Sequence, residues 1–437
     1  MTNDPRPNPK LLTLSQTVSL GVGTMIGAGI FALFGNIASL AGGYAWLVFL
    51  CAGAISSLTG YSYYKLSHLS HTNGGLAEYL NLGWNRGRIG SVISLCYFFS
   101  ITIVLGLVSK AFGHYAAILL GLPDWWVNTL AISIMVAFLI VNARGTKFVG
   151  RIEEYLVAFK LLMLIAFIGI CSYRFNATTY AANQLYMAFD AGKFINAVAL
   201  ANLSFAGFAV VANAGGSVKK TDGVIGKSVF ISIAIVGLIY IGLNISIFGN
   251  MGIASIVAAK NYALAQAALP VLGQFGFTLL AVIAIVSTST NINANIMSAT
   301  NTISYMADDK RMIPALSKVT FGKHGSWAML VTVALVSVMI VALNLSQIAN
   351  VASMTFLLVH TFIPLGNVLN VAKKTDANRL VLWLAVLSNG GVLGYFAYHL
   401  VGTSNLELYV FSGVLIIAIV IQCLNAVLLK GVSEVQV

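Results

Sequence analysis

The sequence predicts an all-α integral membrane protein that crosses the bilayer about twelve times. Only 8% of the 437 residues are charged, against about 25% in soluble domains, so the chain cannot cover a water-facing surface with charges. Hydrophobic residues make up 59%, and the mean hydropathy is +0.90. Long, predominantly apolar runs without a charged residue, such as 127–141 and 408–429, approach or reach the roughly 20 residues that a helix needs to cross the hydrocarbon core.

We place each span where an apolar run is bounded by turn residues or charges. The predicted spans cover residues 13–40, 44–67, 89–120, 125–142, 153–172, 193–214, 225–248, 271–305, 327–345, 348–371, 379–400 and 406–429. The connecting segments are short, so we expect one transmembrane unit over residues 1–437 and no separate soluble domain. The first apolar run follows a polar, proline-rich segment and is too long for a cleavable signal peptide, so none is predicted.

The distribution of positive charge predicts the orientation. With the N-terminus in the cytoplasm, 19 of the 24 Lys and Arg residues fall on the cytoplasmic side, 4 fall outside and Lys160 lies within a span. Cytoplasmic loops of membrane proteins carry this excess. We therefore predict cytoplasmic termini in a cell membrane, in a prokaryote because the loops are compact, and we interpret the net charge of +12 as an orientation signal rather than a nucleic-acid surface.

No pattern of catalytic or metal-binding residues stands out. The four cysteines all fall inside predicted spans, where thiols act as small apolar groups. His68 and His71 have no third ligand nearby, and His360 is expected to be a hydrogen-bonded core residue. A Ser-His-Asp set, a His-Glu-x-x-His motif and a Walker loop are all missing. The sequence predicts no enzyme, no metal and no cofactor.

Glycine clusters interrupt the first and sixth predicted spans. The first span has glycines at 21, 23, 27 and 29, and the sixth reads Phe205-Ala206-Gly207-Phe208 and then Asn213-Ala214-Gly215-Gly216. Each glycine weakens a helix interior by about 1 kcal/mol relative to alanine. The two spans occupy corresponding places if 13–172 and 193–371 are inverted repeats followed by two extra helices at 379–429. Interrupted helices at matching positions indicate the binding site of a transporter.

An interrupted helix exposes backbone groups that lipid cannot satisfy, so they must face a cavity and its ligand. Freed N–H groups suit a carboxylate, and freed carbonyls suit an ammonium group. A ligand with both charges fits both interruptions, which favours an α-amino acid. The alternative is that the glycines only let helices pack closely, as small residues do in membranes.

Four motifs resemble those of the amino acid–polyamine–organocation (APC) superfamily. Gly23-Thr24-Met25-Ile26-Gly27-Ala28-Gly29-Ile30-Phe31 resembles its first-helix signature, and Asn73-Gly74-Gly75 with Glu78-Tyr79 resembles its loop after the second span. Phe205-Ala206-Gly207-Phe208 is similar to its sixth-helix break, and Tyr305-Met306-Ala307-Asp308 with Pro314 to the motif that ends its eighth span.

The resemblance implies a LeuT-type fold with a 5+5 inverted repeat, broken helices 1 and 6, and an alternating-access cycle. It implies that the carboxylate of a substrate is held by backbone groups of Ile26, Gly27, Ala28, Gly29 and Ile30. Carbonyls of Phe205, Ala206 and Gly207 would hold its amino group, with Phe208 beside the pocket. Family members often have Glu where this chain has Ala209, and an acidic stretch where it has Gly216-Ser217-Val218-Lys219-Lys220-Thr221. Both departures weaken the case for the family's gating and for cationic substrates.

Lys160 is the only charged residue predicted deep within a span, and such residues are functional candidates. Resemblance to proton-coupled, sodium-independent members implies that its ammonium replaces Na⁺ and contacts the Gly23 carbonyl and a hydroxyl at Ser287, with Thr288 and Ser289 nearby. The alternative is a lysine that extends to the interface, which we expect of Lys110. The polar run from Ser287 to Asn295 is expected to line the aqueous pathway.

Together these observations predict a proton-coupled symporter of amino acids, with neutral ones favoured. Its expected partners are an amino acid, a proton and the lipid bilayer, and no nucleic acid. Two alternatives remain open: a Na⁺-independent exchanger of amino acids or polyamines, and a transporter-like nutrient sensor.

Overall fold

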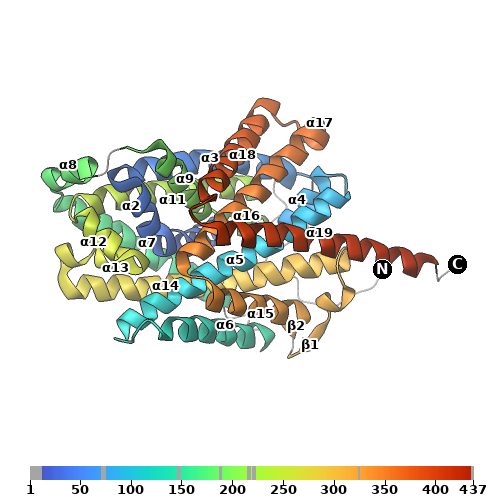
Figure 1. The fold of residues 1–437 in the computed structure, drawn as a ribbon, viewed down its shortest axis with the longest axis horizontal. Helices are drawn as coiled ribbons and strands as arrows, with labels where there is room; N and C mark the ends of the chain where they lie inside the picture. Colours follow the sequence, from blue (N-terminus) through green and yellow to red (C-terminus); the bar gives the residue numbers. More distant parts are fainter. Residues whose placement is uncertain are drawn as a thin grey trace.

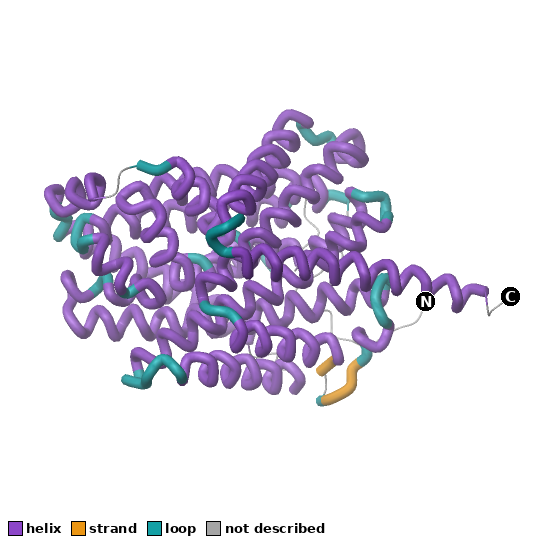
Figure 2. Tube along the Cα trace, viewed as in Figure 1, coloured by secondary structure: helices purple, strands orange, loops and turns teal. Residues whose placement is uncertain are grey.

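A computed structural model describes residues 12–69, 75–144, 149–186, 189–213, 218, 223–322 and 325–434. His71, Gly74 and the segment 214–217 lie outside the described residues. Helices dominate the described part, and one short ribbon pairs β1 (Val319–Phe321) with β2 (Gly325–Ser326) (Figure 2). The all-α prediction is therefore confirmed apart from this ribbon.

The helices are arranged in chain order as shown in Figure 1. They are α1 (Leu14–Ala28), α2 (Ile30–Ala41), α3 (Ala45–Ser67), α4 (Gly75–Gly83), α5 (Arg88–Leu119), α6 (Trp126–Arg144), α7 (Val149–Tyr173), α8 (Ala177–Tyr186), α9 (Ala191–Ser204), α10 (Phe208–Asn213), α11 (Val224–Phe248), α12 (Ile253–Ala258), α13 (Ala263–Gln266), α14 (Leu269–Asp308), α15 (Trp327–Ala342), α16 (Leu345–Gly366), α17 (Ala372–Thr375), α18 (Arg379–Leu400) and α19 (Asn405–Glu434).

Each predicted span coincides with a helix, or with a pair of helices where an interruption was expected. The span predicted over 13–40 is divided into α1 and α2, and the one over 193–214 into α9 and α10. Ten helical segments in the described part are long and apolar enough to cross a membrane, and the first of them, 30–67, joins α2 to α3. The chain is thus a multi-pass membrane protein.

The short helices α4, α8, α12 and α13 were not predicted from the sequence. They lie in connecting segments and carry too few apolar residues in a row to resemble a span. In Figure 1, α4 lies at one end of the bundle, whereas α8, α12 and α13 lie at the opposite end. We refer to these as the α4 end and the α12 end.

The centre of the bundle is occupied by α5, which packs against α14, α16 and α6. The most apolar stretch of α5 is 89% buried, whereas that of α19 is only 11% buried. A helix that is apolar on all sides and buried belongs to the core, and one that is apolar but exposed within the chain faces lipid. The interrupted helices α1, α9 and α10 lie next to this core, so their interruptions fall in the interior of the protein.

Candidate functional site

The first interruption is confined to Gly29, which separates α1 from α2. The Gly29 N–H donates to the Met25 carbonyl oxygen over 2.8 Å, and the Gly29 carbonyl accepts from the Leu33 N–H over 3.0 Å. These are helical i to i−4 bonds. Both backbone groups of Gly29 are therefore occupied, and the interruption frees fewer groups than the glycine cluster predicted.

The second interruption is wider and covers residues 205–207. On its far side the N–H groups of Phe208, Ala209 and Val210 donate to carbonyls three residues earlier, over 3.2, 3.0 and 3.1 Å. This pattern is that of a tight 3₁₀ turn rather than an α-helix. The Gly207 carbonyl also accepts from the Thr24 hydroxyl over 3.1 Å, so the sixth-helix break binds a side chain of the first helix.

The two interruptions are in direct contact. A methyl group at Gly207 would overlap the backbone nitrogen of Met25, and one at Gly29 would overlap the Tyr240 hydroxyl and approach Ser204. The Tyr240 hydroxyl donates to the Met25 carbonyl over 2.8 Å and lies 3.3 Å from the Ser204 carbonyl. Glycine at both positions therefore allows the backbones to touch.

A small cavity of about 30 Å³ lies beside this contact. It has room for about two water molecules, so a bound amino acid would require the surrounding helices to separate. Its polar lining consists of hydroxyl and amide groups from Thr24, Tyr97, Ser100, Asn291 and Asn295. Its apolar lining comes from Ile101, Val104, Ala206, Gly207, Ala209, Val210 and Phe356. All of the lining residues that the structure describes are uncharged.

The predicted substrate-binding residues are brought together only in part. Ala206 and Gly207 line the cavity. Phe208 belongs instead to an aromatic cluster, with ring centres 5.3 Å from Tyr63 and 5.4 Å from His360. Ile26 and Ile30 are fully buried in the core. The roles of Ile26, Gly27, Ala28, Gly29, Ile30, Phe205, Ala206, Gly207 and Phe208 in substrate binding stay predictions.

The cavity residues on α5 were not predicted, because they belong to none of the sequence motifs. Tyr97, Ser100, Ile101 and Val104 are spaced at three- and four-residue intervals on α5, so they share one helix face. Polar residues on one face of an otherwise apolar span were the available signal. The polar run on α14 was predicted to line the pathway, and two of its asparagines, Asn291 and Asn295, line the cavity. Asn291 also donates to the Thr24 carbonyl.

The Lys160 ammonium donates to the Gly23 carbonyl oxygen over 2.6 Å, and the side chain is only 1% exposed. It joins α7 to α1 from within the protein and does not extend to the interface. Among the described residues, the buried Ser287 hydroxyl makes no hydrogen bond, and the Thr288 hydroxyl donates to Ala284 of its own helix. The assignment of Lys160, Gly23, Ser287 and Thr288 to proton coupling stays a prediction.

Lys110 was expected to extend to the membrane interface, and this expectation is wrong. The side chain is 8% exposed, and its ammonium donates to the carbonyls of Ile340, over 2.8 Å, and Leu343. These carbonyls lie at the C-terminal end of α15, where helices lack internal donors. Lys110 therefore caps a helix.

His360 is a hydrogen-bonded core residue, as expected. Its Nε2 lies 2.8 Å from the Tyr63 hydroxyl, and its Nδ1 lies 2.8 Å from the Phe356 carbonyl. The carbonyl can only accept, so Nδ1 carries the proton and Nε2 accepts from the tyrosine.

Comparison with known proteins identifies the family. The family model described as amino acid permease matches residues 12–424. The chain belongs to this family. It is therefore an APC-type membrane transporter and not an enzyme. It is 30% identical over 354 residues to the inner membrane transport protein YbaT of Escherichia coli, covering 80% of this chain and 81% of that protein.

More distant relatives have more specific names. This permease is 24% identical to the serine/threonine exchanger SteT of Bacillus subtilis, over 71% of each chain. It is 23% identical to the low-affinity putrescine importer PlaP of Escherichia coli, over 53% of this chain and 52% of that one.

Proposed function

We propose that this amino acid permease is a proton-coupled symporter of neutral amino acids that works by alternating access. We further propose a LeuT-type fold with twelve spans, in which 13–172 and 193–371 are inverted repeats and 379–429 adds two helices. The interruptions at Gly29 and at 205–207 support this arrangement, because they fall at corresponding places in the two repeats. The excess of Lys and Arg at the α4 end favours a cytoplasmic location for that end, in the cell membrane.

The uncharged lining of the cavity carries the proposal. A zwitterionic substrate brings one carboxylate and one ammonium, and hydroxyl, amide and backbone groups can satisfy both. A polyamine or a cationic amino acid brings a further positive charge, which needs a carboxylate partner in a site shielded from water. The cavity has Ala209 where a carboxylate would reach it, and no acidic residue is among its described lining. This argues against the kind of substrate in the name of PlaP.

Lys160 supports the proton as the coupling ion. A protonated lysine supplies a single positive charge to the Gly23 carbonyl without a bound metal ion. Protonation would then favour the conformation in which α1 and α7 are joined, and deprotonation would release it, which is a shift in the population of two states.

Uptake into proteoliposomes tests the proposal. A panel of radiolabelled amino acids, with putrescine as the cationic comparison, is offered with and without an inward proton gradient in sodium-free buffer. We expect accumulation of neutral amino acids only with the gradient. Counterflow that depends on internal substrate and ignores pH would indicate an exchanger, as in the name of SteT. Specific binding without flux would indicate a sensor.

A further inference from the structure

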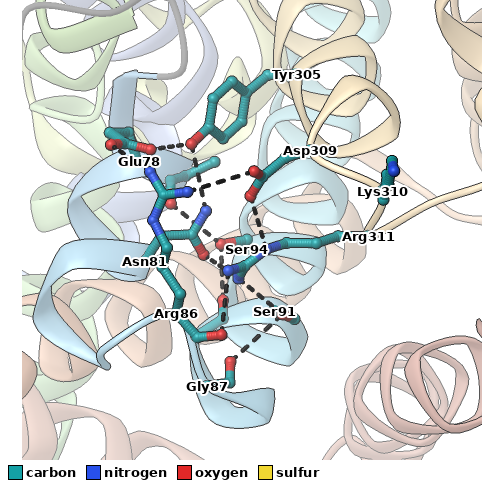
Figure 3. Close-up of polar contacts among 12 residues, drawn as sticks. Glu78, Asn81, Arg86, Gly87, Ser91, Ser94, Tyr305, Asp309, Lys310 and Arg311 are labelled. Carbon is teal, nitrogen blue, oxygen red and sulfur yellow. Dashed lines mark hydrogen bonds and ion pairs between the residues drawn. The ribbon is translucent and has the colours of Figure 1, made fainter. Parts of the chain in front are cut away.

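The helix α4 is attached to the end of α14 by a cluster of charged and polar side chains (Figure 3). The Arg311 guanidinium lies at its centre. It donates to the Asn81 side-chain oxygen, to Ser91 Oγ over 2.9 Å and to the Arg86 carbonyl over 3.1 Å. Its Nε lies 2.8 Å from an Asp309 carboxylate oxygen. Bonds to a guanidinium of this kind are stronger than bonds between neutral groups.

Glu78 extends the same cluster from the middle of α4. Its carboxylate accepts a hydrogen bond from the Tyr305 hydroxyl of α14 and lies 3.4 Å from the Arg86 guanidinium. Burial raises the pKa of the Glu78 carboxyl, while Arg86 opposes that rise. We call Glu78, Asn81, Arg86, Tyr305, Asp309 and Arg311 the clasp.

Other bonds attach α4 to α5 and α16. The Trp84 indole N–H, just beyond α4, donates to the Phe362 carbonyl of α16 over 3.1 Å. The Gly83 carbonyl accepts from the Asn370 side chain over 2.8 Å. The Ser94 hydroxyl of α5 donates to the Gly90 carbonyl of its own helix over 2.7 Å and lies 3.4 Å from the Ala77 carbonyl of α4. Together with the clasp, these bonds make α4 part of a unit with α5, α14 and α16.

A different set of contacts attaches α10 to this unit, and Asn213 supplies them. Asn213 is the last residue of α10 and is 7% exposed. Its amide nitrogen donates to the Tyr97 hydroxyl over 2.7 Å and to Ser298 Oγ. Its amide oxygen accepts from the Leu76 N–H of α4 over 3.2 Å. We call Leu76, Tyr97, Asn213 and Ser298 the latch, and all its bonds join neutral groups.

The latch lies directly beside the cavity. Tyr97 is at once a member of the latch and part of the cavity lining, and Val210, one helical turn before Asn213, also lines the cavity. At its other end α10 has the 3₁₀ turn at 205–207, where the chain is already out of the α-helical hydrogen-bond pattern. The six-residue α10 is thus a short arm between an interruption and the latch.

We propose that Asn213 is the gate residue at the α4 end of the transport pathway, and that α4 stays with α5, α14 and α16 when this end opens. Opening breaks the neutral bonds of the latch, α10 swings about the interruption at 205–207, and the cavity becomes continuous with water at the α4 end. The clasp stays closed because its charge-assisted bonds cost more to break. This inference rests on the proposed transport function.

Disulfide cross-links test which contact opens. In a background whose four cysteines are replaced by alanine, the pair Asn213→Cys and Ser298→Cys joins α10 to α14 across the latch. The matched pair Ala77→Cys and Ser94→Cys joins α4 to α5. Oxidation of the first pair should stop amino acid uptake and reductant should restore it, whereas oxidation of the second should leave uptake unchanged. Uptake that continues with the first pair fully cross-linked would overturn the proposal.

Cysteine labelling tests the gate without any need for transport. Val210→Cys in the same background reports water access to the cavity through its reaction with a membrane-impermeant maleimide. Adding Asn213→Ala should raise the labelling rate about tenfold, which corresponds to about 1.4 kcal/mol of bias toward the open state. Adding Ser94→Ala, which removes a hydroxyl between α4 and α5 that is not part of the latch, should leave the rate unchanged.

The two readouts separate the proposals. If no amino acid is transported but labelling responds to Asn213→Ala as expected, the transport function fails and the gate stands. If uptake is observed and Asn213→Ala labels like its parent, the gate is overturned and the transport function stands.

Discussion

Two buried lysines, Lys110 and Lys160, use the same chemistry for different ends. Each lies on a long helix, each is almost fully buried, and each donates to backbone carbonyls of another helix. The carbonyls that Lys110 binds are at the end of α15, where the helix offers them no N–H. The Gly23 carbonyl lies inside α1, where the helical N–H four residues later is available to it.

This difference decides which contact can be broken repeatedly. Loss of Lys110 would leave buried carbonyls without a donor, which costs about 1–3 kcal/mol for each group. Loss of the Lys160 contact leaves the Gly23 carbonyl within its helix. The proposed proton coupling would need contacts of the second kind. For function, the burial of the ammonium therefore matters less than whether the carbonyl that it binds has another hydrogen-bond donor.

The largest effect is expected for Lys160→Ala. This variant should lose accumulation driven by a proton gradient, because no charge remains to join α7 to α1 in a pH-dependent way. Its melting temperature in detergent should stay close to that of the parent. Proton-driven accumulation at the parental level would rule out the coupling role and place Lys160 in the same class as Lys110.

Lys110→Met should lower stability and leave proton coupling intact, the reverse of what we expect for Lys160→Ala. It leaves the Ile340 and Leu343 carbonyls uncapped, so we expect a loss of stability of about 1–3 kcal/mol for each carbonyl, measured by thermal unfolding in detergent. Proton-driven uptake per folded molecule should be unchanged. A variant that is stable but uncoupled would contradict the assignment of Lys110 as a helix cap.

Gly23→Ala should weaken coupling without abolishing it. The added methyl carbon would lie 2.7 Å from Val157 Cγ2, so α1 and α7 must move apart and the Gly23 carbonyl moves away from the Lys160 ammonium. Overpacking of this kind costs about 1–3 kcal/mol. We expect slower proton-driven uptake and a shifted pH profile. Gly169→Ala, on the same helix as Lys160 but with open space around it, is the control and should behave like the parent.

The smallest effect on stability is expected for Ser287→Ala. Its hydroxyl is buried and makes no hydrogen bond among the described residues, so its removal breaks no bond and should not lower the unfolding free energy. If the hydroxyl joins Lys160 in another conformation of the cycle, proton-driven uptake falls severalfold at unchanged stability. Proton-driven uptake by Ser287→Ala at the parental rate would show that Ser287 takes no part in coupling, and only Lys160 and Gly23 would stay assigned to it.

The positions of the long helices could be predicted because the length of an apolar run is a local property of the sequence. The interruption at 205–207 was predictable for a similar reason, since Gly207 weakens the helix where it stands. The extent of the first interruption was not. Four glycines suggested a wide opening, but only Gly29 interrupts the helix. Gly23 and Gly27 stay helical and lie close to Val157 and to Asn291, so they let neighbouring helices pack closely.

The parts of the site that could not be predicted depend on partners far away in the sequence. Lys110 and the carbonyl of Ile340 are 230 residues apart, and nothing near Lys110 indicates a helix end beside it. Likewise, Tyr97 lies in an apolar span whose facing is set by α10 and α14. The contact between Lys160 and Gly23 was reached through family resemblance, not through the pattern of residues alone.

The Tyr240 hydroxyl has a single proton but two carbonyls within reach, one on each interrupted helix. In this conformation the Tyr240 hydroxyl lies closer to the Met25 carbonyl, so its hydrogen bond to the Ser204 carbonyl is the weaker one. A displacement of about half an ångström would reverse that preference. One hydrogen-bond donor therefore lies between the two interrupted helices, and a relative displacement of the helices changes which carbonyl it binds.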